Sequence, residues 1–455
     1  MSTTKTINPT TGKEIAEYKR INIDEVKTKI AAANTCFKEW KKLSYAERAV
    51  YMHKLAHVLE NNNEAYALLI TNEMGKTLEQ AKKEVDKCAL VCKHYADNAA
   101  TMLKDEQVET EAFKSYVTFQ PIGVILAVMP WNFPFYQVIR FAAPALMAGN
   151  TGVLKHASNV QGCAFALEDA FEKAGFPAGA FTNLNVTSDA IKEIIEDKNI
   201  VAVTLTGSEP AGRSVAAIAG QNLKKTVMEL GGSDAYIILE DADLEKATEL
   251  ATTGRLQNNG QTCIAAKRFI VVDEIYNSFL ELFTQKMKAA KMGDPTDAST
   301  FYGPMARVDL RDELHEQVQQ TIKQGGRLII GGEIPEGEAA YYPATIIADV
   351  KPGMVGFDEE LFGPVASVIR AKDEKEAIVL ANHSQFGLGS GVITSNKERG
   401  EKVALQLEAG NSFVNKLVAS DPRLPFGGIK NSGYGRELSG YGMKEFVNTK
   451  TIWVD

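Results

Sequence analysis

The spacing of apolar residues changes twice along this chain. Over residues 20–104 they recur three and four positions apart with few helix breakers, for example in Glu47–Glu60 and Asn63–Met74. This spacing predicts helices. Near Val108–Phe119 the pattern becomes alternating, which predicts a strand, and its polarity and the neighbouring Pro121 indicate an edge strand or a protruding hairpin.

From residue 122 onward, short aliphatic runs alternate with helical segments. The predicted strands are Ile122–Val128, Thr151–Lys155, Phe181–Asn185 and Val201–Thr206. The predicted helices that follow them are Tyr136–Ala148, Gln161–Ala174, Ser188–Asp197 and Ala211–Gly220. Apolar strands that alternate with helices predict a parallel sheet covered on both faces, here of the Rossmann-like, dinucleotide-binding kind.

A second alternation follows the glycine pair Gly231-Gly232. Its predicted strands are Phe269–Val272, Leu328–Ile330, Val365–Ile369 and Val392–Thr394, and its helices are Ile275–Lys291, Leu310–Gln324 and Lys375–Ala381. The tail Glu445–Val454 is again strand-like, and we expect it to pair with Val108–Phe119. The fold class is therefore α/β, with a dinucleotide-binding domain (1–104 and 122–231), a second α/β domain (232–430) and small β elements (105–121 and 431–455).

Composition narrows the class of protein. A chain of 455 residues is too long for one compact core, and its net charge of −8 argues against nucleic acid or an anionic membrane surface as partner. Its apolar runs fall far short of the roughly 20 residues that cross a bilayer, and Met1–Lys5 has no signal-peptide core. The five cysteines have no metal-ligand spacing. We therefore expect a cytoplasmic protein with free thiols and no metal.

Cys263 is the first candidate for chemistry. It follows Asn258-Asn259-Gly260, a sequence that ends the preceding helical pattern, so it is predicted to lie on a turn. Backbone amides at such a turn can lower the pKa of a thiol. A lone cysteine is more often a buried structural residue, which is our interpretation of the other four.

Two further polar residues stand where predicted strands end. Glu229 ends the run Thr226–Met228 and precedes a glycine pair, where burial in a cleft would raise the pKa of its carboxyl group. Asn132 lies between Pro130 and Pro134, which would hold its amide rigidly enough to stabilise an oxyanion. Taken singly, Glu229 fits a solvated strand end and Asn132 a helix cap equally well.

Other residues are placed to bind a dinucleotide. Gly207 and Ser208 connect a strand to a helix N-terminus, which suits a pyrophosphate, although the spacing is not Gly-x-Gly-x-x-Gly. Lys155 ends a strand at the position that grips an adenosine ribose in such folds. Glu360 could hold a second ribose, although a surface position is the more common fate of a glutamate.

Together these segments resemble the aldehyde dehydrogenase superfamily, and most of all short bacterial members of its succinate-semialdehyde dehydrogenase branch. The matching segments are Pro130–Pro134, Thr206–Ser208, Glu229–Gly232, Gly260–Cys263, Glu360–Pro364 and Pro425–Gly428. Their order and spacing match along nearly the whole chain. One such motif can arise by chance, but six in order cannot.

The resemblance implies a mechanism. Cys263 would attack the aldehyde, Asn132 and the backbone N–H of Cys263 would hold the oxyanion, and Glu229 would activate water to hydrolyse the resulting thioester. The implied cofactor contacts are Trp131, Lys155, Gly207, Ser208, Glu360 and Phe362. Many NAD-preferring relatives carry an acidic residue at the position of Ser158, so we expect NADP to be accepted and preferred over NAD, with Lys155, Ser158 and His156 near its 2′-phosphate.

The resemblance also suggests a substrate. Arg140 matches a carboxylate-binding arginine of the succinate-semialdehyde dehydrogenase branch, and a bidentate contact there would select an ω-carboxy aldehyde. Some members carry a second arginine where this chain has Gln257, and Arg423 could replace it. Tyr136 would supply an apolar wall, which serves a neutral aliphatic or aromatic aldehyde equally well. Both substrate classes therefore remain open.

Other classes of protein fit less well. A CoA-acylating relative usually lacks the glutamate found here at 229, and a non-catalytic structural or binding protein would tolerate loss of Cys263 or Asn132. A thiol protease or esterase needs a histidine base, and none of the six histidines lies beside a family motif. The resemblance also implies self-association, as a homodimer or homotetramer, through Val108–Phe119 and Glu445–Val454.

Overall fold

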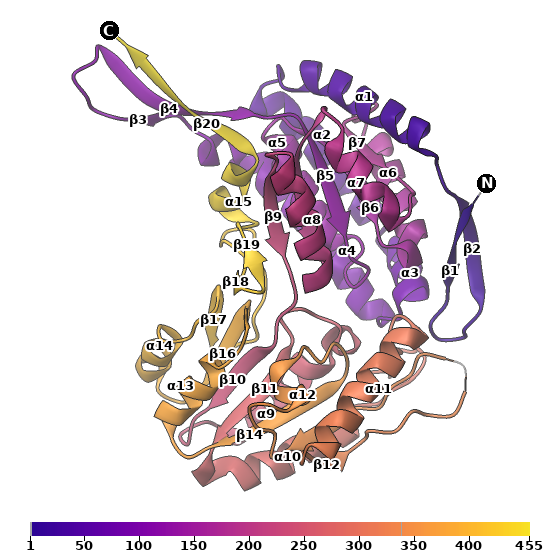
Figure 1. Ribbon diagram of the computed structural model, residues 1–455, viewed down its shortest axis with the longest axis vertical. Coiled ribbons are helices and arrows are strands. Elements are labelled where there is room, and N and C mark those ends of the chain that lie inside the picture. Colours follow the sequence, from indigo (N-terminus) through magenta and orange to yellow (C-terminus); the bar gives the residue numbers. More distant parts are fainter. Residues whose placement is uncertain (1, 338) are drawn as a thin grey trace.

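The computed structural model describes residues 2–337 and 339–455. It has two large parallel sheets, one in each of two lobes, and a β ribbon that projects from the first lobe (Figure 1). In the figure, the upper lobe contains the N-terminal part of the chain, the lower lobe contains the pink and orange part that follows it, and the yellow C-terminal segment returns to the upper lobe and the ribbon. The domain boundaries given above remain a prediction.

Four helices precede the first sheet, as the spacing of apolar residues predicts. They are α1 (Ile23–Trp40), α2 (Tyr45–Asn61), α3 (Asn63–Met74) and α4 (Leu78–Met102). The first two begin with capping boxes, in which Asn22 pairs with Glu25 and Ser44 pairs with Glu47. Each box satisfies two backbone N–H groups at a helix start. The long helix α4 matters most for the site, because one of its faces lines a cavity.

The first sheet has the strand order β19-β9-β8-β5-β6-β7, and β19 is its only antiparallel strand among the described residues. The strands are β5 (Val124–Met129), β6 (Thr151–His156), β7 (Phe181–Asn183), β8 (Ile200–Thr206), β9 (Lys225–Glu229) and β19 (Gly433–Tyr434). Helices α5 (Tyr136–Met147), α6 (Gln161–Lys173), α7 (Ile191–Glu196) and α8 (Glu209–Gln221) connect them. The chain winds outward from β5 through β6 and β7, then returns to β8. A ligand site is therefore expected at the carboxyl ends of β5 and β8, where the winding reverses.

The second sheet has the order β12-β13-β14-β11-β10-β16-β17, with only the edge strand β12 antiparallel in the described chain. Its strands are β10 (Asp234–Ile238), β11 (Ala266–Val272), β12 (Arg327–Ile330), β13 (Thr345–Ala348), β14 (Val365–Ala371), β16 (Gly389–Ile393) and β17 (Asn411–Val414). The helices of this lobe are α9 (Leu244–Leu256), α10 (Tyr276–Ala289), α11 (Val308–Lys323), α12 (Val355–Asp358), α13 (Glu374–Asn382) and α14 (Lys397–Ala404). This confirms the predicted second α/β alternation.

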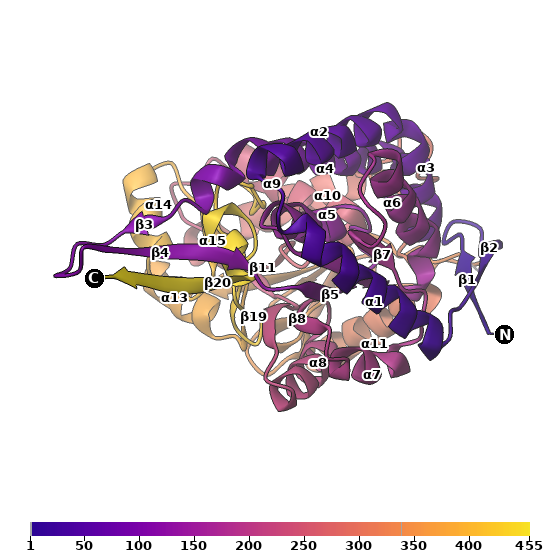
Figure 2. The same cartoon turned by 90° about the horizontal axis from the view of Figure 1, so that it is seen from above.

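The projecting ribbon joins segments far apart in sequence. It consists of β3 (Glu106–Gln107), β4 (Lys114–Pro121) and β20 (Val447–Val454), and α15 (Ser439–Glu445) leads into it. β20 runs antiparallel to β4, from Val447 opposite Pro121 to Val454 opposite Lys114. Figure 2 shows the ribbon extending from the body with the C-terminus at its tip. The predicted pairing of these two segments is confirmed.

Two short antiparallel strand pairs were not predicted. β1 (Thr3–Ile7) and β2 (Glu14–Lys19) form an antiparallel pair, and β15 (Phe386–Gly387) pairs with β18 (Ile429–Lys430). β1 and β2 are largely polar, and β15 and β18 have only two residues each, so none of the four gives a clear alternating signal. In the part of the chain that the structure describes, no helix combines the length and apolar character that crossing a membrane requires.

Candidate active site

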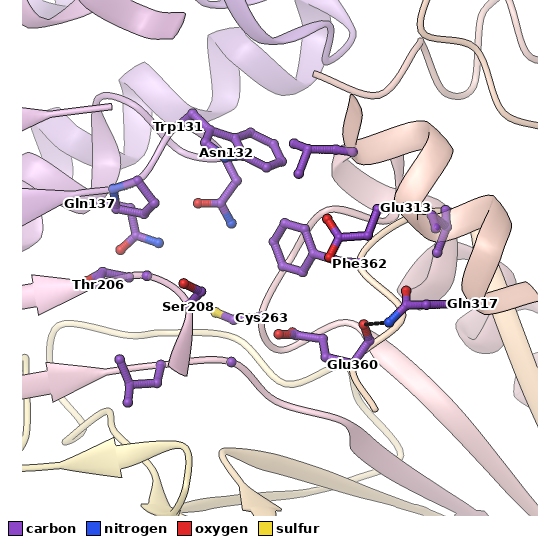
Figure 3. A pocket seen from close by; sticks show the side chains of 16 residues that line it. Trp131, Asn132, Gln137, Thr206, Ser208, Cys263, Glu313, Gln317, Glu360 and Phe362 are labelled. Atoms are coloured by element: carbon purple, nitrogen blue, oxygen red, sulfur yellow. Dashed lines mark hydrogen bonds between the residues drawn. The ribbon is translucent and has the colours of Figure 1, made fainter. Parts of the chain in front are cut away.

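Cys263 lies where two cavities meet. The first, of about 270 Å³, is lined by residues that follow β5, β8 and β9 and by parts of α11 and the 360–362 segment (Figure 3). The second, of about 210 Å³, is lined by α4, α5 and the 417–420 segment. Among the described residues, Cys263 and Gln137 line both cavities. A group on Cys263 is therefore accessible from either side.

The turn before Cys263 is rigid. Asn258 and Asn259 have φ values of 57°, and Gly260 has a φ of 75°. A side chain at Gly260 would collide with the backbone of Gly363, so only glycine fits there. The Asn259 amide donates to the carbonyls of Gly75 (2.8 Å) and Pro304 (2.7 Å). The predicted turn is confirmed, and contacts distant in sequence fix its shape.

Asn132 is bound to the same turn. The side-chain Nδ2 of Asn132 donates to the backbone carbonyl of Gln261 at 3.0 Å. The backbone carbonyl of Asn132 accepts from Nδ2 of Asn258 at 3.0 Å. The side chain is 4% exposed and lines the first cavity together with Cys263. A side-chain amide has two N–H donors, so one remains for an oxyanion.

The segment that carries Asn132 is braced from behind. Oε1 of Glu84 accepts from the backbone N–H groups of Phe135 (2.9 Å) and Tyr136 (3.0 Å), and Glu84 also forms a buried ion pair with Lys76. His156 is buried, with its Nε2 2.9 Å from the Pro134 carbonyl oxygen. This corrects the expectation that His156 lies near a cofactor phosphate, because its ring packs beneath the Asn132 segment.

The thiol of Cys263 differs from the expectation. Burial raises its pKa to about 12, although the positive charges of Arg140 and Lys267 act in the opposite direction. The pKa of the free thiol is therefore raised and not lowered, because loss of solvation outweighs these two positive charges. Lys267 also donates from Nζ to the carbonyls of Cys263 (2.6 Å) and Thr262 (3.0 Å), which fixes the backbone beneath the sulfur.

Glu229 ends β9 and is 2% exposed. Within the described chain neither carboxylate oxygen has a hydrogen-bond partner. Burial, followed by the nearby charge of Glu437, raises the pKa of this carboxyl group well above its usual range. The predicted direction is confirmed. An unpartnered carboxyl group directly before Leu230 and Gly231, which line the first cavity, is suited to taking a proton.

The first cavity has the features of a dinucleotide site. Its lining includes five of the residues expected to contact the cofactor, namely Trp131, Gly207, Ser208, Glu360 and Phe362. Ser208 is the N-cap of α8 but makes no side-chain cap, so the helix starts with uncapped N–H groups at the cavity wall. The Trp131 and Phe362 rings meet edge to face with centroids 5.7 Å apart. Lys155 is the penultimate residue of β6, and the exposed Ser158 opens the short helical turn that follows; neither residue is in this lining.

Glu360 is held from two sides. Its Oε1 accepts from the Gly232 N–H at 3.1 Å and forms an ion pair with Lys267 Nζ at 3.0 Å. A side chain at Gly231 would collide with this carboxylate. The glycine pair therefore allows Glu360 to enter the cavity, as a ribose ligand must.

The second cavity contains only part of the predicted substrate set. Tyr136, Arg140 and Gln257 line it. Arg423 is not among the described residues of the lining. Its side chain is 77% exposed and forms an ion pair with Asp421. We therefore do not retain Arg423 in the substrate site.

Arg140 is buried and already paired. Its Nε lies 2.5 Å from Oε2 of Glu437, with side-chain exposures of 3% and 6%, and its Nη2 lies 3.3 Å from Oγ1 of Thr206. Glu437 raises the pKa of Arg140, although burial alone would lower it. The guanidinium group therefore has an internal counter-ion.

Comparison with known proteins agrees with this geometry. The sequence profile described as the Aldehyde dehydrogenase family matches residues 1–452. The chain belongs to the aldehyde dehydrogenase family. A protein of Synechocystis sp. named probable succinate-semialdehyde dehydrogenase [NADP(+)] is 49% identical to this aldehyde dehydrogenase over 99% of both chains. An aldehyde dehydrogenase of Paenarthrobacter nicotinovorans is also 49% identical, over 98% of this chain and 99% of its own.

A solved structure has the same fold. The succinic semialdehyde dehydrogenase of Streptococcus pyogenes, in complex with NADP+, superimposes on this aldehyde dehydrogenase with a TM-score of 0.97. The two chains are 40% identical, and the match covers 99% of each. The α/β fold with a Rossmann-like sheet is thereby established.

Sequence reasoning missed several residues of this aldehyde dehydrogenase. Lys267 forms an ion pair with Glu360 and a hydrogen bond to the backbone carbonyl of Cys263. The sequence feature that could have indicated it is the position of a lysine within the buried strand Ala266–Val272. Glu437 and Ser420 gave no signal, because only the folded chain brings them to Arg140 and Tyr136. Lys87 was missed because it lies in α4, a helix that carries none of the family motifs, although it lines the second cavity.

Proposed function

We propose that this enzyme oxidises succinate semialdehyde to succinate with NADP, through a thioester on Cys263. The observation that carries the proposal is the position of Cys263 between a dinucleotide cavity and a second cavity lined by three cationic side chains, Lys83, Lys87 and Arg140. Cationic side chains favour an aldehyde with a carboxylate at its far end.

The chain's own residues perform three tasks in this reaction. Cys263 loses its proton and bonds to the aldehyde carbon, while the Asn132 amide and the Cys263 backbone N–H stabilise the oxyanion. NADP, when bound, supplies the hydride acceptor that converts this adduct to a thioester. Glu229 then takes a proton from water, the hydroxide oxygen bonds to the acyl carbon, and the carbon–sulfur bond breaks to release the acid. The net reaction consumes one aldehyde, one NADP and one water.

Three observations support NADP over NAD. Ser158 leaves the region after β6 without the acidic side chain that would repel a 2′-phosphate. Arg20 lies close enough to Lys155 to lower the pKa of that lysine, after the larger effect of burial. The Synechocystis relative is named for NADP(+), and the Streptococcus pyogenes enzyme was crystallised with NADP+. A concentration of positive charge favours a phosphate.

A neutral aldehyde is the second candidate substrate class. The pairing of Arg140 with Glu437 favours it, because that guanidinium already has a partner. Phe133, Tyr136 and Phe426 give the second cavity an apolar wall. A neutral aldehyde would use the same Cys263 chemistry.

Initial rates of NADPH or NADH formation separate the candidates. We expect kcat/KM for succinate semialdehyde with NADP to exceed that for butanal, a neutral aldehyde of equal chain length, and to exceed the value with NAD. Equal rates on both aldehydes would overturn the substrate assignment. A Cys263→Ala variant should be inactive on both, and residual turnover there would overturn the mechanism.

We also propose that the protein self-associates through the ribbon. β20 is an edge strand of its sheet, with Trp453 46% exposed and Val454 41% exposed. An exposed apolar edge strand is a template for pairing with another chain. Light scattering should give the mass of a dimer or tetramer, and removal of residues 447–455 should yield monomers. A monomeric wild-type protein would refute this.

A further inference from the structure

One face of α4 forms a wall of the second cavity. Gln80, Lys83, Glu84 and Lys87 all line it, at the spacing of successive helical turns. Cys263 lines the same cavity. An aldehyde bound at Cys263 therefore directs its far end into a space with α4 on one side.

Among the described residues, two lysines of this wall, Lys83 and Lys87, have no carboxylate partner, and Lys87 is the less exposed of the two. Its Nζ donates to Oγ of Ser420 at 2.8 Å and lies 4.3 Å from the centroid of the Tyr136 ring. The Tyr136 hydroxyl also contacts Ser420, with 2.8 Å between the two oxygens. Among the described residues, no carboxylate oxygen lies within 4.0 Å of this Nζ.

The nearby charged groups are already engaged. Glu84 is paired with Lys76 and accepts from the backbone N–H groups of the Asn132 segment. Asp421 is paired with Arg423, and Arg140 is paired with Glu437. The ammonium of Lys87 thus faces the cavity with only a hydroxyl group and an aromatic ring as partners.

We infer that Lys87 is the cation that binds the distal carboxylate of the substrate, with the Ser420 hydroxyl as a second donor. This inference rests on the proposed function. Arg140 then has a different role. Its guanidinium group stays paired with Glu437 and adds positive charge to the cavity without binding the substrate carboxylate. A substrate carboxylate would supply the counter-ion that Lys87 lacks. Gln257, the position where a second arginine was sought, lines the same cavity and is neutral.

The electrostatics of Lys87 agree with this geometry. Burial, followed by the positive charge of Arg140, lowers the pKa of Lys87 to about 8, while Cys88, Asp421 and Glu84 act in the opposite direction. The titratable or charged groups around it come from three parts of the chain. They are Lys83, Glu84 and Cys88 on α4, Tyr136 and Arg140 on α5, and Asp421 beside Ser420. The ammonium is protonated below about pH 8 and loses its charge above it.

The test is a comparison of Lys87→Met with Lys93→Met, which removes a lysine of the same helix that pairs with Glu60 and lies outside the cavity lining. We expect Lys87→Met to raise KM for succinate semialdehyde by about 10- to 100-fold, the range for losing one charged hydrogen bond, with kcat changed by less than about threefold. Its kcat/KM for butanal should be unchanged or higher. Lys93→Met should behave as wild type, and Lys87→Arg should recover part of the lost affinity.

The pH profile gives a readout that a structural role would not produce. For wild type, KM for succinate semialdehyde should rise above about pH 8, and this rise should be absent in Lys87→Met. Equal losses on both aldehydes in Lys87→Met, or an unchanged preference for succinate semialdehyde, would overturn the role of Lys87. If wild type itself does not prefer succinate semialdehyde to butanal, the proposed substrate fails first, so the two failures can be distinguished.

Discussion

Arg140 and Glu437 form a buried ion pair between α5 and the segment that follows β19, with 2.5 Å between Nε and Oε2. Burial raises the pKa of Glu437, while Arg140 lowers it. A buried pair of this kind contributes little net stability, but removing one partner leaves an uncompensated charge. Because Arg140 also lines the substrate cavity, one substitution there disturbs both the fold and the site.

The first prediction follows from that pair. Arg140→Met and Glu437→Gln should each lower the free energy of unfolding by about 3–5 kcal/mol, because each leaves the other partner buried alone. The double variant should lose less than the sum of the two. Urea unfolding of all four proteins measures this cycle, and simple additivity of the two losses would contradict the coupling. Loss of activity in Arg140→Met alone would therefore not identify a carboxylate ligand.

Cofactor preference should depend on Ser158. A Ser158→Glu variant places a negative charge beside the expected 2′-phosphate. We expect kcat/KM with NADP to fall by about a hundredfold, equivalent to about 3 kcal/mol of repulsion, while the value with NAD changes little. Steady-state rates with both cofactors measure the ratio. An equal fall with both cofactors would show that Ser158 acts on the fold and not on the phosphate.

The free enzyme should resist alkylation at Cys263. Because burial raises the pKa of this thiol to about 12, the reactive thiolate is a small fraction at neutral pH. The rate of modification by iodoacetamide should rise by about tenfold per pH unit and reach no plateau below pH 10. A Cys263→Ala variant corrects for labelling at the partly buried Cys36. A plateau near pH 7 would show a preformed thiolate.

Glu229 should make stability depend on pH in an unusual direction. Its pKa is raised in the folded protein, so between the unfolded and folded values the folded chain binds more protons. Its contribution to stability is therefore present below the unfolded pKa, about 4.3, and declines as pH rises through the folded pKa. Glu229→Gln should raise the Tm relative to wild type, and more at pH 8 than at pH 5. Equal Tm shifts at both pH values would contradict this.

The sequence predicts the fold well because most elements have their own local pattern. The helices α2 and α3 and the strands β5, β6 and β8 lie where apolar spacing and breakers place them. Cys263 and Asn132 could be named from sequence because each lies on a turn beside a strand or helix end. The pairing of β4 with β20 was predicted because both segments are exposed and alternating.

The remainder of the site depends on contacts that sequence does not encode locally. The sequence alone indicates that Arg140 is a surface charge or a substrate ligand. Its ion pair with Glu437, which is far away in the sequence, is visible only in the folded chain. The sequence alone indicates that Lys87 is a solvated residue of a helix. Its contacts with Ser420 and Tyr136 form only in the folded chain. The pKa of Cys263 moves opposite to expectation because burial, a tertiary effect, outweighs the positive charges of Arg140 and Lys267.

The most direct test of the mechanism uses Glu229→Gln with succinate semialdehyde and NADP. We expect a burst of about one NADPH per subunit with little further turnover, and mass spectrometry should find a succinyl thioester on the peptide that contains Cys263. Continuous turnover without an adduct would contradict a thioester hydrolysed by Glu229. A complete absence of the burst would show that Glu229 is needed before the thioester forms, contrary to the role assigned here.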